Sequence, residues 1–127
     1  MNINKFATCL NCMDGRVQLP AIQWISKNYG IDYVDMITEA GMDGVLSNQE
    51  SDITSILMKI NISLKKHGSK KIFIVGHFDC AGNLVDFEAH KKHIKLAVSK
   101  LKVLFSSFEI VGLWISENWE VEKIYKE

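Results

Sequence analysis

Two short segments of the sequence carry most of the side chains that could perform chemistry. Cys12, Asp14 and Arg16 stand at every second position of the first segment, and His77 and Cys80 stand three residues apart in the second. Zinc favours cysteine thiolates and histidine imidazoles, and catalytic zinc sites use three protein ligands and keep a fourth position open. The sequence therefore predicts a zinc site formed by Cys12, His77 and Cys80.

Asp14 and Arg16 are predicted to act beside this metal. In an extended segment, residues at every second position point to the same side, so both side chains would accompany Cys12. A bidentate ion pair with Arg16 would keep the pKa of Asp14 low. The Asp14 carboxylate would then accept a hydrogen bond from metal-bound water and favour hydroxide. Without Arg16, Asp14 could instead swing onto the metal and fill the fourth position.

Cys9 offers an alternative, because Cys9 and Cys12 form a C-x-x-C pattern that could complete a closed Cys3His site. If Cys9 lies in a strand, however, about 10 Å of extended chain separates it from Cys12, and it faces the other way. We therefore expect Cys9 to be buried and inert.

The roles of four other residues depend on their surroundings. Asp79 could cap the segment that follows it or hydrogen-bond to a metal ligand. Trp119 lies in a polar turn, where it could line a cleft or a subunit contact. His90 and His93 are surrounded by lysines, which favours a solvated helix face over a metal site.

Strand-like and helix-like patterns alternate along the chain. Apolar runs predict strands over residues 6–10, 33–38, 71–76 and 109–116, with a short tail after the last one. Helices are expected from Pro20 to Gly30, from a Ser47–Glu50 capping box to Gly68, and through residues 94–105. Residues 40–44 are expected to form a loop.

This alternation predicts an α/β fold in which helices on both faces of a mostly parallel sheet make three αβα layers. The length suggests a single domain over residues 1–127. Ligands of such sheets bind beyond the carboxyl ends of the strands. The first and third predicted strands end at the two segments that carry the candidate zinc ligands, so fold and chemistry select the same place.

Composition excludes several functions. Lys plus Arg and Asp plus Glu number 15 each, so there is no basic field to attract nucleic acid. The longest apolar runs are too short to cross a bilayer. The start of the sequence lacks the pattern of a signal peptide, and three cysteines do not suit a disulfide framework. We therefore expect a cytoplasmic protein that binds neither nucleic acid nor membrane.

The motifs Cys12-Met13-Asp14-Gly15-Arg16 and Gly76-His77-Phe78-Asp79-Cys80 resemble the signature of the β-class carbonic anhydrases. Val17, Pro20, Ala40-Gly41 and Gly112-Leu113-Trp114 extend the similarity over most of the chain. The resemblance implies the strand order 2-1-3-4, zinc held by the two cysteines and the histidine, and an Asp14–Arg16 dyad that assists the metal-bound water. The sequence departs from the family at Glu39 and Ala81.

The activity implied by the resemblance is reversible hydration of carbon dioxide to bicarbonate. Zinc-bound hydroxide would attack the carbon, and backbone amides near Gly41 could receive the developing bicarbonate. Two alternatives keep the same site: hydrolysis of carbonyl sulfide or carbon disulfide, and a zinc that is not catalytic. The resemblance also implies a homodimer or a higher homo-oligomer.

Overall fold

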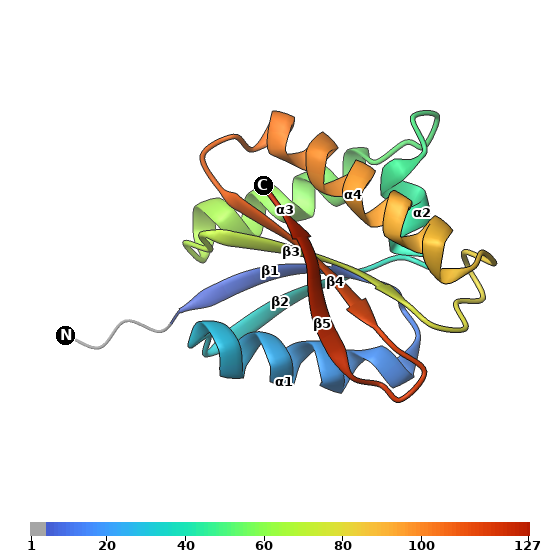
Figure 1. Ribbon diagram of the computed structural model, residues 1–127. Helices are drawn as coiled ribbons and strands as arrows, with labels where there is room; N and C mark the ends of the chain where they lie inside the picture. The colour runs from blue at the N-terminus through green and yellow to red at the C-terminus, as the bar shows by residue number, and fades with distance from the viewer. Residues whose placement is uncertain (1–4) are drawn as a thin grey trace.

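The computed structural model describes residues 5–127, and its centre is a five-stranded sheet (Figure 1). The strands lie in the order β2-β1-β3-β4-β5. Their bounds are Phe6–Asn11 for β1, Tyr33–Thr38 for β2, Lys71–His77 for β3, Glu109–Ile115 for β4 and Val121–Lys126 for β5. The first four strands are parallel, and β5 pairs antiparallel with β4. The predicted order 2-1-3-4 is confirmed.

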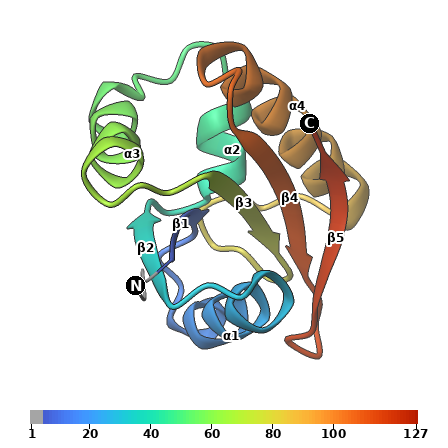
Figure 2. The same ribbon diagram turned by 90° about the vertical axis from the view of Figure 1, so that its left-hand side faces the viewer.

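Helices cover both faces of the sheet. The helix α1 (Gln18–Tyr29) lies on one face, whereas α2 (Met42–Ser47), α3 (Thr54–Lys66) and α4 (Phe87–Leu104) lie on the other (Figure 2). Each face has its own hydrophobic cluster, built around Ile25 and Phe73 on the α1 side and around Ile60, Ile74 and Ile94 on the opposite side. The predicted three-layer αβα architecture is confirmed.

Local sequence explains where several elements begin and end. Pro20 lies in the first turn of α1, where a missing N–H costs nothing. Gly30 ends that helix with a left-handed backbone, φ 63°. The strand β3 is apolar and buried from Ile72 to Val75, as a central parallel strand covered on both faces requires.

Three local predictions were wrong. The capping box does not form, because Ser47 is the last residue of α2; the N–H of Thr54, the first residue of α3, donates to the Asp52 carboxylate at 3.0 Å. The loop expected at residues 40–44 turns into α2 at Met42. The tail forms β5, a half-exposed edge strand whose pattern of isolated apolar residues is weak until β4 is there to pair with it.

Within residues 5–127, none of the helices combines the length and the apolar character needed to cross a membrane.

Candidate metal centre

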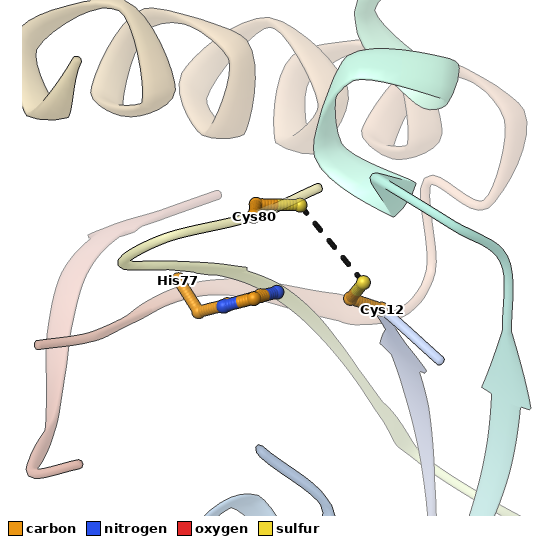
Figure 3. Close-up of side chains that lie close together, drawn as sticks. All are labelled: Cys12, His77 and Cys80. Carbon is orange, nitrogen blue, oxygen red and sulfur yellow. Dashed lines mark hydrogen bonds between the residues drawn. The ribbon is translucent and has the colours of Figure 1, made fainter. Parts of the chain in front are cut away.

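The carboxyl ends of β1 and β3 bring the three predicted ligands together. The two strands are parallel neighbours. Cys12 directly follows β1, His77 is the last residue of β3, and Cys80 lies in the turn after it (Figure 3). Their ligand atoms all lie within 4.8 Å of one another, and all three residues are buried. Among the residues that the structure describes, no other group of His, Cys, Asp or Glu is arranged in this way.

The histidine is oriented as a metal ligand. Its Nδ1 lies 2.7 Å from the carbonyl oxygen of Phe78, so Nδ1 carries the proton and donates it. Nε2 therefore holds a lone pair, which points toward the two sulfurs (Figure 3). This buried atom has no hydrogen-bond partner in the described chain, and such an atom costs about 1–3 kcal/mol. One imidazole lone pair beside two thiols is a donor set that fits zinc.

Burial favours the uncharged forms of Cys80 and His77 when no metal is bound. It raises the pKa of Cys80 to about 11, with a further contribution from the neighbouring Cys12, and it lowers the pKa of His77. The two sulfurs lie 3.9 Å apart, close enough for one thiol to donate to the other. Metal binding must displace the thiol protons, so the affinity of this site for zinc is expected to rise with pH.

Asp14 and Arg16 form the predicted pair, although not on an extended strand. The strand β1 ends at Asn11, and Asp14 caps a short 3-10 helix, Gly15–Val17, by accepting the backbone N–H of Arg16 at 2.9 Å. Arg16 Nη2 donates to Asp14 Oδ2 at 2.7 Å, and Nε donates to Oδ1 at 3.1 Å. The side-chain hydrogen bond from Arg16 is the main reason that the pKa of Asp14 falls to about 2. Asp14 is therefore a carboxylate at any physiological pH.

Gly41 contacts both the segment that contains Cys12 and the segment that contains Cys80. Its backbone is left-handed, φ 64°, and its N–H donates to Cys12 Sγ at 3.5 Å. A Cβ at Gly41 would come within 2.4 Å of the carbonyl oxygen of Gly82, two residues after Cys80. Gly41 was predicted as a substrate contact, and in this structure its amide is directed at a ligand sulfur.

Sequence reasoning missed a buried, hydrogen-bonded Asp–His pair close to this site. Asp43 and His90 are each 1% exposed, and His90 Nδ1 lies 2.6 Å from Asp43 Oδ2. Asn83 donates to Asp43 Oδ1 at 3.1 Å and lies 2.9 Å from His93 Nδ1. The expectation that His90 lies on a solvated helix face was wrong. A signal existed, because His90 precedes Ile94 by four residues and so falls on the apolar stripe of α4.

Cys9 is buried on β1 among apolar side chains and is not part of the ligand group. Burial raises the pKa of its thiol to about 12. The structure thus confirms that Cys9 is buried and places it outside the ligand group.

Comparison with known proteins identifies the family. The family model described as putative carbonic anhydrase matches residues 2–125, which is nearly the whole chain. The chain therefore belongs to this family, and the resemblance seen in the two motifs is confirmed. No match is found among curated proteins.

Solved carbonic anhydrases share the fold. The β-carbonic anhydrase isoform I of Trichomonas vaginalis is 19% identical, with a TM-score of 0.63 over 98% of this chain and 86% of that one. The carbonic anhydrase of Streptococcus mutans is 16% identical, with a TM-score of 0.66 over 97% and 84% of the two chains. One of two tetrameric β-carbonic anhydrases from Sordaria macrospora is 11% identical, with a TM-score of 0.58 over 100% and 84%. At these identities the likeness concerns the fold.

Proposed function

We propose that this chain reversibly hydrates carbon dioxide to bicarbonate at a zinc ion held by Cys12, His77 and Cys80. The observation that carries the proposal is the buried ligand group, in which the lone pair of His77 Nε2 faces two thiols and has no hydrogen-bond partner among residues 5–127. Membership of the carbonic anhydrase family supports the same reaction.

The bound zinc would supply Lewis acidity that activates a water molecule for attack on the carbon of carbon dioxide. The protein's own contribution lies in Asp14 and Arg16. Because the pKa of Asp14 is held at about 2, its carboxylate can only accept hydrogen bonds, and it would orient an attacking water by accepting a hydrogen bond from it. Two guanidinium nitrogens of Arg16 donate hydrogen bonds to this carboxylate. These bonds would keep Asp14 from turning toward the metal ligands. The overall reaction releases one proton to solvent for each bicarbonate formed.

We further expect a homodimer or a higher homo-oligomer that acts in the cytoplasm. The tetrameric Sordaria macrospora enzymes with the same fold support self-association. Sedimentation of the purified, zinc-loaded chain measures the assembly.

The test combines metal content with a carbon dioxide hydration assay. Wild type is expected to bind one zinc per chain and to hydrate carbon dioxide. Asp14→Ala should keep the zinc and lose activity by about 10²-fold or more, because the group that orients the water is gone. Asp52→Ala is the matched control, since this carboxylate also has a lowered pKa but accepts its hydrogen bonds from Thr54, at the start of α3. It should retain both zinc and activity.

A zinc-loaded wild type that does not hydrate carbon dioxide at alkaline pH would contradict the proposal. Turnover of carbonyl sulfide or carbon disulfide by that preparation would then assign the site a different substrate. Zinc without any turnover would assign it a role that is not catalytic.

A further inference from the structure

Two residues with an unusual backbone conformation meet at the same side chain. Within residues 5–127, Asp79 (φ 57°) and Trp119 (φ 60°) are the non-glycine residues with positive φ. A left-handed backbone costs a residue with a Cβ about 1–2 kcal/mol. Both residues contact Arg16, although they belong to different turns. Conformations of this kind persist where the surrounding structure enforces them, and they cluster at functional sites.

Together they enclose the guanidinium of Arg16. Asp14 occupies one edge of this planar group. On another edge, Nη1 donates to Asp79 Oδ2 at 3.2 Å and Nη2 donates to the Asp79 carbonyl oxygen at 3.1 Å. The central carbon of the guanidinium, Cζ, lies over the ring of Trp119, 4.7 Å from the ring centroid. Hydrogen bonds from Asp14 and Asp79 and the ring of Trp119 therefore contact the guanidinium from three directions.

The two turns are themselves well anchored. Asp79 lies between the candidate ligands His77 and Cys80. Trp119 lies between β4 and β5, in a turn closed by its own N–H, which donates to the Ser116 carbonyl at 2.8 Å. Its partly buried ring also packs against the hydrophobic cluster that contains Cys12 and Cys80.

The Asp14–Arg16 pair needs such support. The side chain of Arg16 is 47% exposed, and exposed ion pairs contribute only about 0–1 kcal/mol. In the described chain, the hydrogen bonds of the Asp14 carboxylate all come from Arg16. If the guanidinium turns away, only one backbone N–H still holds Asp14.

We propose that Trp119 and Asp79 are positioning residues, which clamp Arg16 so that Asp14 stays paired and does not reach the metal ligands. The statement about the metal rests on the proposed function, whereas the clamp itself is a property of the chain without metal. Through Trp119, the hairpin of β4 and β5 sets the position of the Asp14 carboxylate.

Substitutions at Trp119 separate a clamp from ordinary packing. Trp119→Leu keeps apolar bulk but removes the aromatic face. Trp119→Phe keeps a face and is the conservative rescue. Trp119→Asn removes the ring while suiting the left-handed backbone, so it controls for relief of strain.

The first measurement needs no metal. In ¹⁵N-labelled protein, the Arg16 Nε–H is expected to exchange slowly with solvent in wild type and in Trp119→Phe. In Trp119→Leu and Trp119→Asn its exchange should become at least about 10-fold faster, because opening of the pair is no longer restrained. Asp79→Gly, which removes the carboxylate and relieves the backbone, should also accelerate it. Unchanged exchange in Trp119→Leu would overturn the clamp.

The second measurement uses cobalt in place of zinc. Binding of thiocyanate, followed by the visible spectrum of the cobalt protein, reports whether a metal position is open. We expect about 10-fold weaker binding in Trp119→Leu, because Asp14 competes for that position, and recovery in the double variant Trp119→Leu/Asp14→Ala. Wild-type affinity in Trp119→Leu would contradict the proposal, and so would weak binding that the double variant does not restore. A zinc-loaded wild type that fails to hydrate carbon dioxide would contradict the proposed function. The exchange rate of the Arg16 Nε–H would still test the clamp, because that measurement needs no metal.

Discussion

At the scale of single residues, the three cysteines have the same chemistry in very different surroundings. Cys12 and Cys80 face each other and the lone pair of His77, whereas Cys9 is enclosed by apolar side chains on β1. The pKa of Cys9 is raised to about 12 by burial alone. Cys9 is therefore separated from Cys12 and Cys80 by its position, because its thiol lies outside the ligand group.

This difference predicts how stability depends on pH. In the folded state Cys9 keeps its proton up to a pH of about 12, whereas in the unfolded state it loses the proton near its ordinary pKa of 9.0. The contribution of Cys9 is therefore fully present below pH 9 and is lost as the pH rises toward 12, by about 1.4 kcal/mol per pH unit. Urea unfolding of the metal-free protein between pH 8 and pH 11 measures this slope.

The matched variant for this measurement is Cys9→Ala. It should be less stable at pH 8 because it leaves a cavity, but its free energy of unfolding should fall less steeply above pH 9. Cys80 contributes to the slope in both proteins, so the difference isolates Cys9. Parallel pH profiles would show that the Cys9 thiol is not protected by the fold.

At the scale of elements, two connections set the distance between the cysteines. The turn from β2 into α2 contains Gly41, and the segment from β3 to α4 contains Gly82. Their backbones pack directly against each other, because neither residue has a Cβ. Gly41 also donates to Cys12 Sγ. The position of Cys12 relative to the segment that contains Cys80 therefore depends on the Gly41–Gly82 contact.

Gly41→Ala is therefore expected to weaken zinc binding as well as the fold. The left-handed backbone costs Ala about 1–2 kcal/mol, and the new Cβ would have to push Gly82 away. We expect at least a 10-fold increase in the dissociation constant for zinc, measured by competition with a chromophoric chelator.

Gly68→Ala provides the control for that variant. Gly68 has a similar backbone, φ 71°, but a Cβ there would meet no atom within 4 Å. It should lose only the free energy that a left-handed backbone costs Ala, about 1–2 kcal/mol, and keep wild-type zinc affinity. Equal zinc affinities in both alanine variants would refute the role given to the Gly41–Gly82 contact.

At the scale of the whole molecule, the Asp43–His90 pair joins α2 to α4 in a region that excludes water. Asn83 connects the same carboxylate to the segment that follows Cys80. A second pair, Asp35–His67, has the same chemistry but lies at the surface, with 42% of the His67 side chain exposed. The chain therefore contains a buried pair and an exposed pair for direct comparison.

His90→Ala is expected to destabilise the protein by about 3–5 kcal/mol, because it leaves the buried Asp43 side chain without its His90 hydrogen-bond partner. His67→Ala should cost about 1 kcal/mol or less, since water replaces the lost partner of Asp35. Unfolding in urea measures both values. If both variants lose a similar free energy of unfolding, burial does not make the Asp43–His90 pair more stabilising than the exposed Asp35–His67 pair.

The sequence by itself determined the fold class and the candidate ligands. Alternation of apolar strands and amphipathic helices specifies a parallel sheet, and Cys12, His77 and Cys80 follow strands whose carboxyl ends lie on one edge of it. These features depend on local sequence patterns and on two motifs that resemble those of the β-class carbonic anhydrases, so they can be predicted without the tertiary structure. The Asp14–Arg16 pair is also local, but the reason given for it was incomplete, because a turn and not an extended strand aligns the two side chains.

Only the tertiary structure decided what surrounds those residues. The strand β5 forms because β4 offers its edge, His90 is buried because α2 packs against α4, and Arg16 is enclosed because two distant turns bring Asp79 and Trp119 to it. Each of these contacts joins segments far apart in the chain. Their free energy depends on burial and orientation that exist only after the sheet and its helices have assembled, and no pattern within one segment encodes it.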